Sequence, residues 1–504
     1  MKIIAFDLGT GGIKASLYNE KLQALAQTFL EYQTIYPAPG FREQRPDDWW
    51  EGVCRCCRDL LEISHTDNRE IGCLALSGHS LVTVPVKKNR GCLTDSVPIW
   101  SDTRAEAEAE EFFKKIPQKQ WYETTGNGFP PACYSIFKLM WMKNHQREIY
   151  ASADGFLGSK DYINWKLTGQ MATDFSYASG CGAYHLDKGE LNPTFLEAAG
   201  LSPDKFPPIL PSHQIVGTVT KEAARCTGLI PGTPVACGGV DNACMALGAV
   251  GNREGAVYIS LGTSSWIPVN SSRPVLDAEK KPYVFAHIQE GMYTSAFSIF
   301  SGGNSFRWIR DTLSSETGKT LSYDELCHLA QKSPPGAGGV LFNPSLAGGT
   351  SQDKSTNIRG AFLNLSLSTG RNDLIRAALE GITMNLKCSY DFMKEKTRIG
   401  DTLMICGGGS KSPFWMQLFA DIFQTRIVKT NIDQDAASLG AAAIAARAVG
   451  LYDDYSVLQS VHQEQQYYMP NTDLAAFYKE LTERFRHISY ILSDLGDYMQ
   501  SPIS

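Results

Sequence analysis

The sequence Asp7-Leu8-Gly9-Thr10-Gly11-Gly12 follows an apolar run at residues 3–6, and a similar sequence, Ser260-Leu261-Gly262-Thr263-Ser264-Ser265, follows another at residues 256–259. An apolar run that ends in glycine and small polar residues predicts a strand followed by a tight turn. Glycine lets the backbone approach an anion closely, and Thr or Ser hydroxyl groups add hydrogen-bond donors. The two sequences therefore predict two phosphate-holding turns that can face one another across a cleft.

The first of these turns differs from the second in two charged residues. It carries Asp7 at the end of its strand and is followed by Lys14, whereas the second has neither. Asp7 can organise a hydrated divalent cation and Lys14 can neutralise phosphate charge, which favours a nucleoside triphosphate over a dinucleotide. No Gly-Lys-Ser/Thr ending is present, so neither turn is a Walker loop. Either turn alone is most often only a strand end, but its repetition in both halves indicates a functional pair.

The composition is that of an ordinary globular protein of 504 residues, with 43% hydrophobic and 20% charged residues. This length predicts two large domains or more. A net charge of -6 without a basic block argues against nucleic acid as the main partner. The 13 cysteines form no zinc-like pairs, which indicates free thiols in the cytoplasm. The most apolar long stretch, residues 436–449, is too short to cross a membrane.

Strand and helix patterns repeat in the two halves of the chain. Each half opens with a strand, a glycine turn and a further strand, and later contains a helix and another strand. This order predicts an internal duplication around a central cleft, with domains at residues 1–246 and 247–504. The expected strands lie at residues 3–7, 13–19, 24–33, 71–77, 234–237, 255–261, 265–269, 291–295 and 401–406, and the expected helices lie at residues 47–63, capped by residues 46–48, and 373–394.

Asp241 lies between a predicted buried strand and an apolar helical run. An Asp at the start of a helix is most often an N-cap, which accounts for the residue without any function. A phosphate-transfer site, in contrast, needs a carboxylate that accepts the hydroxyl proton during attack on the γ-phosphate. The glycine-rich turns elsewhere in the chain favour this second interpretation, with Asp241 as general base.

Six short segments occur in one order along the chain, at residues 7–10, 100–104, 138–141, 238–242, 260–264 and 407–409. In this order and approximate spacing the chain resembles the FGGY carbohydrate kinases from residue 1 to about residue 450, and the xylulokinase, or pentulose kinase, branch most of all. The resemblance implies an α/β fold of two ribonuclease H-like domains, as in actin-type and hexokinase-type ATPases, around a central cleft. It also implies that the first domain mainly holds the sugar and the second mainly holds ATP.

The resemblance assigns roles to individual residues. Asp241 becomes the catalytic base and a second candidate for the metal, while Asp7 acts on Mg²⁺ through water. The segment at residues 138–141 is interpreted as structural. The residues implied for ATP binding are Thr10, Gly11, Gly12 and Lys14 in the first turn, Gly262, Thr263 and Ser264 in the second, and Gly303, Gly407, Gly408, Gly409 and Ser412 near the adenosine.

The resemblance also implies a sugar site, made of His79, Ser80, Leu81, Trp100, Asp102, Asp241 and Asn242. The Trp100 ring can pack on carbon-bound hydrogens and Asp102 can accept from hydroxyl groups, but Trp100 can equally be a surface-packed aromatic and Asp102 can pair locally with Arg104. After the strand predicted at residues 71–77, xylulokinases typically carry Gly-Gln-Met-His, whereas this chain has Gly78-His79-Ser80-Leu81. Leu81 therefore stands at the position of the sugar-binding His. Loss of that hydrogen-bonding partner predicts an altered hydroxyl preference, so the substrate need not be D-xylulose.

These observations predict an ATP-dependent kinase for a terminal hydroxyl group of D-xylulose or another pentulose, a six-carbon ketose, a sugar acid or a polyol. The expected partners are a small-molecule sugar, ATP and Mg²⁺, without nucleic acid or a membrane, and a homodimer is expected by analogy. Two other classes stay open, an inactive sugar or nucleotide sensor and an actin-like or chaperone-type ATPase. Retention of Asp7, Thr10 and Asp241 disfavours the sensor, and the segment at residues 100–104 disfavours the ATPase.

Overall fold

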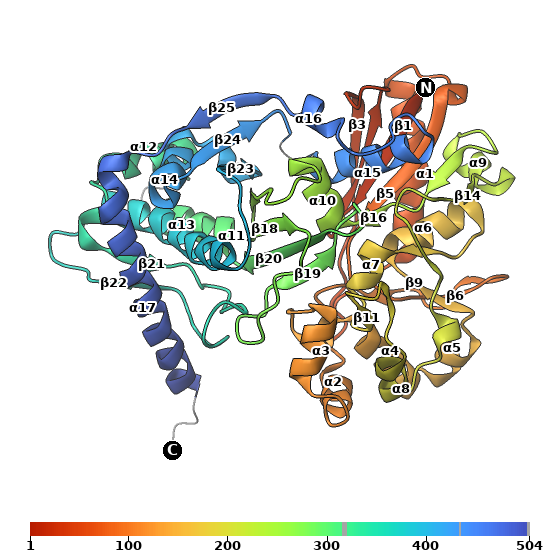
Figure 1. The fold of residues 1–504 in the computed structure, drawn as a ribbon, viewed down its shortest axis with the longest axis horizontal. Helices are drawn as coiled ribbons and strands as arrows, with labels where there is room; N and C mark the ends of the chain where they lie inside the picture. The colour runs from red at the N-terminus through yellow and green to blue at the C-terminus, as the bar shows by residue number, and fades with distance from the viewer. Residues whose placement is uncertain (315–319, 433–434, 501–504) are drawn as a thin grey trace.

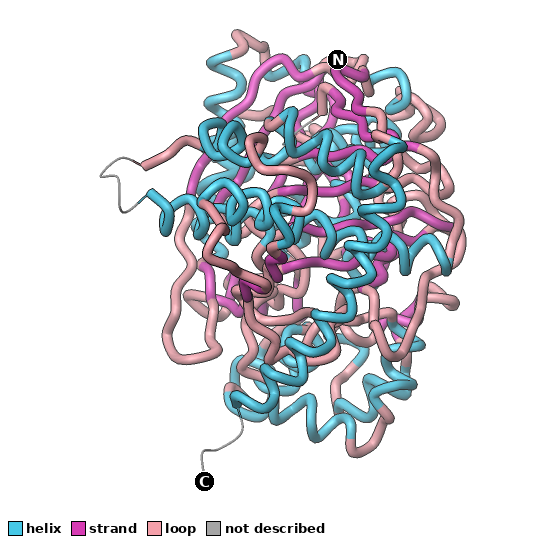
Figure 2. Tube along the Cα trace, turned by 90° about the vertical axis from the view of Figure 1, so that its left-hand side faces the viewer, coloured by secondary structure: helices cyan, strands magenta, loops and turns pink. Residues whose placement is uncertain are grey.

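The first half of the chain builds one seven-stranded sheet and the second half builds another (Figure 1). This arrangement is seen in a computed structural model that describes residues 1–314, 320–432 and 435–500. We call the two halves the first and second lobes. Figure 2 looks onto the second lobe from the side and shows helices lying over its strands.

The first sheet has the strand order β14-β15-β5-β1-β2-β3, and β16 also pairs with β5. Strands β1, β2 and β3 form antiparallel hairpins, whereas β5 runs parallel to β1 and to β16. The carboxyl ends of β1, β5 and β16 therefore lie at one edge. The strands are β1 (Lys2–Leu8), β2 (Gly12–Tyr18), β3 (Ala24–Glu31), β5 (Ile71–Gly78), β14 (Ile215–Thr218), β15 (Pro234–Ala236) and β16 (Gly239–Val240).

The second sheet repeats the opening of the first. Strands β17 and β18 form an antiparallel hairpin, and β17 runs parallel to β23, as β1 does to β5. The order is β19-β20-β18-β17-β23-β24-β25. The strands are β17 (Tyr258–Leu261), β18 (Ser265–Ser271), β19 (Tyr283–Ala286), β20 (Tyr293–Ile299), β23 (Thr402–Cys406), β24 (Arg426–Thr430) and β25 (Glu464–Tyr468).

The remaining elements surround these sheets. The helices are α1 (Pro46–Ile63), α2 (Glu106–Phe113), α3 (Gln118–Thr125), α4 (Ser135–His145), α5 (Arg147–Ser152), α6 (Ser159–Thr168), α7 (Phe175–Ser179), α8 (Pro193–Ala199), α9 (Lys221–Thr227), α10 (Asp241–Val250), α11 (Gly302–Ser314), α12 (Tyr323–Ala330), α13 (Arg371–Lys396), α14 (Pro413–Phe423), α15 (Ala436–Ala448), α16 (Leu458–Val461) and α17 (Ala475–Gln500). The short paired strands are β4 (Glu43–Gln44) with β8 (Val97–Pro98), β6 (Val84–Lys87) with β7 (Gly91–Cys92) and β9 (Gly155–Leu157), β10 (Thr173–Asp174) with β13 (Ile209–Leu210), β11 (Tyr184–His185) with β12 (Glu190–Leu191), and β21 (Leu341–Asn343) with β22 (Ala361–Leu363).

Helices and sheets alternate in five layers. Helices α1, α6 and α9 cover the outer face of the first sheet, and α11, α13 and α14 cover the outer face of the second (Figure 1). Between the sheets lie α10 and α15, whose buried side chains join residues of β1, β5, β17 and β23 in one apolar core. Burial of this shared core stabilises the association of the two lobes.

The two central helices cross at close range. A Cβ on Gly248 of α10 would lie 1.8 Å from Ala436 O, and a Cβ on Gly440 of α15 would lie 2.0 Å from Cys244 O. Each helix therefore needs a glycine where the other passes. The most apolar long stretch of the sequence, residues 436–449, contains α15, the second of these two crossing helices.

The structure also bears on three smaller predictions. None of the 13 cysteines, all of which lie within the described residues, forms a disulfide bond. None of the helices that the structure describes combines the length and the apolar character that crossing a membrane requires. The expected cap of α1 is wrong, because Arg45 occupies the N-cap position without a side-chain bond. Pro46 instead stands at the first helical turn, where its missing N–H group has no cost.

Candidate active site

The first turn, residues 9–11, connects β1 to β2. Gly9 N–H donates to Gly12 O over 3.0 Å, and Thr10 O accepts from Gln44 Nε2 over 2.7 Å. Position 12 requires glycine, because a Cβ there would lie 2.5 Å from Leu30 O. Gly11 is exposed with open space around it, so this side of the turn is accessible to a ligand.

The second turn, residues 262–264, connects β17 to β18 and rests on the start of α11. Gly303 N–H donates to Gly262 O over 2.8 Å, and Asn304 N–H donates to Thr263 O over 3.0 Å. A Cβ on Gly303 would lie 2.3 Å from Gly262 O, so this position also requires glycine. Thr263 and Ser264 are exposed. The structure thus brings Gly303 into direct contact with the second turn.

The triple glycine, residues 407–409, follows β23 at the same edge of the second sheet as the second turn. Gly407 has a φ of +92°, in the region that favours glycine, and a Cβ on Gly409 would lie 2.5 Å from the Leu261 side chain. Gly408 is exposed and has open space around it. The structure therefore groups the second turn and the triple glycine.

Ser412 uses its hydroxyl group inside the protein. Its Oγ accepts a hydrogen bond from Trp415 N–H over 3.3 Å as the N-cap of α14, and it donates to Cys327 Sγ over 3.2 Å. The hydroxyl group of Ser412 is therefore engaged as a helix cap, and the location of Ser412 near the adenosine stays a prediction.

Asp7 and Asp241 place their carboxyl groups near one edge of the first sheet. Strand pairing aligns Asp7 with Ser77 on β5, and Ser77 with Gly239 on β16, two residues before Asp241. Ser77 Oγ donates to Asp7 Oδ1 over 3.2 Å. Burial raises the pKa of Asp7. Burial, and next the nearby charge of Asp7, raise the pKa of Asp241 to about 7.

Asp241 is the first residue of α10 and not its cap. Val240 occupies the N-cap position, and no side chain caps the helix there. Asp241 Oδ1 accepts a hydrogen bond from the adjacent Asn242 N–H over 2.8 Å. The N-cap interpretation therefore does not account for Asp241, whose half-buried carboxyl group has a pKa suited to proton transfer near neutral pH.

Lys14 forms an ion pair with Asp435, which lies 421 residues further along the chain. Lys14 is directly opposite Asp7 in the β1–β2 pair, and Asp435 precedes α15. Tyr18 OH and Ser438 Oγ, 3.0 Å apart, add a second polar contact between the same elements. The structure thus gives Lys14 a carboxylate partner that the local sequence did not indicate.

Trp100 joins the first turn to the predicted sugar segment. Its Nε1 donates to Thr10 Oγ1 over 2.9 Å. Its half-buried ring lies 5.9 Å from the Phe129 ring, which lies 6.0 Å from the Phe300 ring of the second lobe. Trp100 therefore lies beside the first turn, in an aromatic group that continues into the other lobe.

Asp102 has no carboxylate oxygen available for a sugar. The residue is 0% exposed, and its Oδ2 accepts hydrogen bonds from Arg42 N–H at 2.6 Å and Arg104 Nη2 at 2.7 Å. Its Oδ1 accepts from Arg104 Nε at 2.8 Å. The prediction of a sugar contact is therefore corrected to the local ion pair, because the planar guanidinium group engages both oxygens. Arg104 also pairs with Glu43 at 2.6 Å.

The segment after β5 points mainly into the first lobe. His79 is 1% exposed, with Nδ1 3.0 Å from Leu8 O and its ring packed edge-on against Trp49. Burial lowers the pKa of His79 to about 4, so the ring is neutral at physiological pH. Leu81 has a positive φ of 61° and is buried in an apolar core. The predicted sugar contact of Leu81 is corrected to a buried structural position, whereas Ser80 is half-exposed. His79 Nε2 has no hydrogen-bond partner among the described residues, so its sugar contact stays a prediction.

Lys138 and Gln44 donate hydrogen bonds to backbone carbonyl groups of the candidate site. Lys138, interpreted as structural from the sequence, is 1% exposed and donates to Leu81 O over 2.9 Å and Ile99 O over 2.6 Å. It thereby ties together the two segments predicted for the sugar. Gln44, which donates a hydrogen bond to the backbone of Thr10, is not marked by any local sequence pattern, because the two residues are 34 positions apart.

Comparison with known proteins places the chain in a family. The models of the N-terminal and C-terminal domains of the FGGY family of carbohydrate kinases match residues 2–248 and 257–449. The chain is 29% identical over 500 residues to the xylulose kinase of Bacillus subtilis (strain 168), covering 99% of each chain. It is 28% identical over 513 residues to the gluconokinase of Bacillus licheniformis, covering 99% of this chain and 98% of that one. The structure of the xylulose kinase from Rhodospirillum rubrum matches with a TM-score of 0.91 at 26% identity, covering 99% of this chain and 100% of that one.

These matches and the two repeated sheets define a two-domain ATPase fold of the actin and hexokinase type. The chain belongs to the FGGY family of carbohydrate kinases, whose members act on a sugar and use ATP. The predicted family and fold class are confirmed. The sugar is not identified, because relatives with two different substrates match almost equally well.

Proposed function

We propose that this kinase transfers the γ-phosphate of ATP to a terminal hydroxyl group of a ketose. The observation that carries this proposal is the half-buried Asp241, which follows the first sheet near Asp7 and has a pKa of about 7. A carboxyl group with this pKa is partly ionised at neutral pH and still basic enough to accept a hydroxyl proton. An inactive sensor has no need of such a base.

Asp241 acts as the general base in the proposed reaction. It accepts the proton of the attacking hydroxyl group while the hydroxyl oxygen forms a bond to the γ-phosphorus. The bond between that phosphorus and the β,γ-bridging oxygen breaks, and ADP leaves with the bridging oxygen. Asp241 then releases the proton to solvent.

The two turns and the triple glycine are proposed to hold ATP. Backbone N–H groups at Gly11 and Gly12 suit phosphate oxygens, and the hydroxyl groups of Thr10, Thr263 and Ser264 add donors. Gly262 N–H already donates to Ser264 O over 3.2 Å, so Gly262 is proposed to let phosphate approach because it has no side chain. Lys14 supplies positive charge, for which phosphate competes with Asp435. Gly407, Gly408 and Gly409 form the proposed adenosine side, beside Gly303 and the second turn. We assign sugar binding mainly to residues 1–246 and ATP binding mainly to residues 247–504.

Asp7 and Asp241 fit the Mg²⁺ ion that accompanies ATP. Their raised pKa values reflect buried carboxyl groups whose ionised forms a cation would favour. Magnesium prefers carboxylate oxygens and is commonly held by one or two of them together with water and phosphate. When bound, Mg²⁺ neutralises charge on the β- and γ-phosphates.

The proposed acceptor is a pentulose such as D-xylulose, and a sugar acid is the second candidate. The proposed sugar contacts beside Asp241 are three half-buried residues, Trp100, Ser80 and Asn242. Trp100 bonds to Thr10 in the first turn, Ser80 follows β5 next to the end of β1, and Asn242 adjoins Asp241. The gluconokinase match supports the second candidate. The homodimer and the cytoplasmic location remain predictions.

A panel of acceptors in an assay of ADP production tests this proposal. The panel comprises D-xylulose, D-ribulose, D-fructose, D-gluconate and glycerol, each with Mg²⁺ and ATP. We expect ADP production with a ketose to exceed the background without acceptor by at least about tenfold, because water is a poor substitute for the bound hydroxyl group. Equal ADP production without acceptor indicates an ATPase, and none with any acceptor indicates a sensor.

A further inference from the structure

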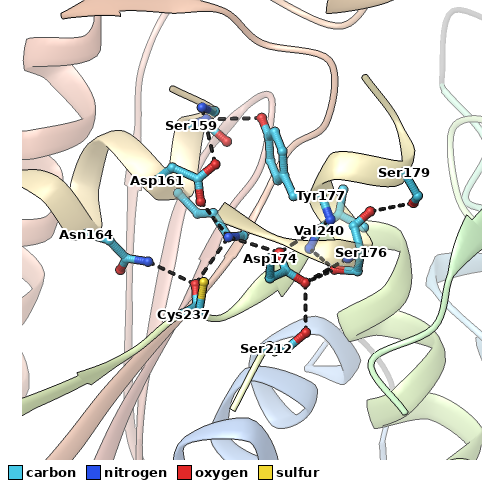
Figure 3. A network of polar contacts seen from close by, with 12 residues as sticks. Ser159, Asp161, Asn164, Asp174, Ser176, Tyr177, Ser179, Ser212, Cys237 and Val240 are labelled. Atoms are coloured by element: carbon cyan, nitrogen blue, oxygen red, sulfur yellow. Dashed lines mark hydrogen bonds and ion pairs between the residues drawn. The ribbon is translucent and has the colours of Figure 1, made fainter. Parts of the chain in front are cut away.

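A buried polar network contacts Cys237 and Val240, in the residues that lead to Asp241 (Figure 3). We call Lys160, Asp161, Asp174, Ser176 and Ser212 the Lys160 network. Lys160 Nζ lies 2.6 Å from Asp161 Oδ1 and 3.0 Å from Asp174 Oδ1. Asp174 Oδ2 accepts hydrogen bonds from Ser176 Oγ at 2.5 Å and Ser212 Oγ at 2.7 Å. Each of the five residues is at most 1% exposed.

The charged groups of the Lys160 network are paired and hydrogen-bonded, as burial of two carboxylates and one ammonium group requires. Burial acts to lower the pKa of Lys160, but Asp161 and Asp174 outweigh it and raise the pKa, which keeps the ammonium group charged. Asp174 Oδ2 also accepts from Ser176 N–H over 2.9 Å at the start of α7. A buried polar network with satisfied groups holds its members in one arrangement.

The network and its neighbour Asn164 reach three backbone groups in the residues before Asp241. The contacts are Lys160 Nζ to Cys237 O at 3.2 Å, Asn164 Nδ2 to Cys237 O at 2.9 Å, Gly238 N–H to Ser212 O at 3.0 Å, and Val240 N–H to Ser176 Oγ at 3.0 Å. They come from α6, α7 and the loop before β14, so three separate elements converge on residues 237–240.

We propose that Ser176, held by Asp174 and Lys160, is a positioning residue for Asp241. Val240 is the N-cap residue of α10, so its backbone sets where the Asp241 side chain begins. Its N–H group donates to Ser176 Oγ, which itself donates to Asp174. The chain of contacts from Lys160 to Val240 thus fixes the backbone from which the base projects. This inference rests on the proposed function, in which Asp241 is the base.

If Ser176 had only a structural role, its loss would lower stability without a separate effect on the chemical step. Asp174 caps α7 through the N–H groups of Ser176 and Tyr177, and this cap does not involve the Ser176 hydroxyl group's bond to Val240. Loss of that hydroxyl group therefore removes the Val240 bond while both cap bonds remain. A misplaced base slows the chemical step, whereas the turns proposed for ATP are held by other contacts.

The test compares Ser176→Ala with Ser295→Ala in the full-length protein. Ser295 is a matched control, because it is also 0% exposed and its Oγ accepts a backbone bond, from Val275 N–H over 3.0 Å, in the second lobe. We expect similar decreases in Tm for the two variants. In Ser176→Ala we expect kcat to fall at least about tenfold with KM for sugar and ATP within about twofold, and in Ser295→Ala we expect kcat within about twofold.

Amide hydrogen exchange without sugar or ATP gives a second readout. Exchange in the peptide covering residues 237–242 should become faster in Ser176→Ala and stay unchanged in Ser295→Ala. Equal kcat in the two variants, or unchanged exchange in Ser176→Ala, overturns the positioning role. Failure of the proposed function looks different, because it requires a wild type without acceptor-dependent ADP production or an Asp241→Ala variant that keeps its turnover.

Discussion

Trp100 Nε1 donates a hydrogen bond to Thr10 Oγ1 over 2.9 Å, between residues 90 positions apart in the chain. Thr10 lies in the first turn, which is proposed for phosphate, and Trp100 begins the segment proposed for the sugar. The two ends of the proposed reaction therefore share a direct contact. A change in either residue alters the geometry at both ends.

Trp100→Phe and Thr10→Val each remove one partner of this bond and keep most of the side-chain volume. A net hydrogen bond contributes about 1 kcal/mol, so we expect kcat/KM for the sugar to fall about fivefold in each variant. We expect the double variant to lose less than the sum of the two single losses, because both single variants remove the same bond. Thr10→Ser is the control that keeps the acceptor. Independent, additive losses in this double-mutant cycle would contradict the account.

Asp102→Asn should affect stability more than substrate choice. The substitution leaves the Arg104 guanidinium group, whose side chain is 3% exposed, with one buried charged partner fewer. Breaking a buried ion pair typically lowers the free energy of unfolding by about 3–5 kcal/mol, and urea unfolding measures this loss. Asp67→Asn, which removes an exposed ion pair with Arg69, is the control with little change. Normal stability with a selective rise in KM for the sugar would restore the sugar-contact prediction.

Asp241→Asn should stabilise the protein without Mg²⁺ at alkaline pH. The pKa of Asp241 is about 7 in the folded protein and 3.8 in its ordinary state, so the folded protein binds more protons between these values. The wild type therefore loses stability as pH rises from about 4 to about 7, by up to about 4 kcal/mol at 1.36 kcal/mol per pH unit.

The measurement is the thermal midpoint of both proteins at pH 4.5 and pH 8. We expect the variant to exceed the wild type at pH 8 and the difference to shrink at pH 4.5. If the wild type is more stable than the variant at pH 8, the surroundings of Asp241 do not disfavour its ionised form, and this prediction is wrong.

Gly303→Ala should disrupt the second turn. The new Cβ would lie 2.3 Å from Gly262 O, so the turn has to move away from its present position. We expect kcat/KM for ATP to fall about 100-fold, because a displacement of about 1 Å in the groups that position a substrate can lower the rate about 100-fold. Gly370→Ala is the control, because its Cβ meets no atom closer than 3.6 Å. Equal kinetics for the two variants would separate Gly303 from ATP binding.

The sequence predicted correctly those strands and turns that depend on neighbouring residues in the chain. The strand, turn and strand at both turns follow from apolar runs that end in glycine, and position 12 needs glycine because Leu30 O lies so close. The long helix α13 extends beyond its predicted range at both ends, as expected when helix ends are read from the sequence alone. Predictions of this kind depend on neighbours in sequence.

Two features of the site depend on contacts between distant residues, which the local sequence does not show. The burial of His79 depends on Trp49, 30 positions away, and the ion pair of Lys14 depends on Asp435 at the start of another lobe's helix. Asp102 was assigned to the sugar although its own neighbour Arg104 engages both oxygens. A sequence pattern names the residue types at a site, but only the packed structure shows which of them are already paired.

Asp241→Ala removes the carboxyl group that is proposed to accept the hydroxyl proton. The measurement is acceptor-dependent ADP production by the wild type and the variant, using the best acceptor of the panel, with circular dichroism and Tm to show that the variant is folded. We expect a folded variant with a kcat lower by at least about 100-fold, because a positioned general base typically contributes about this much or more. A folded variant with near-normal turnover would contradict the assignment of Asp241 as the base.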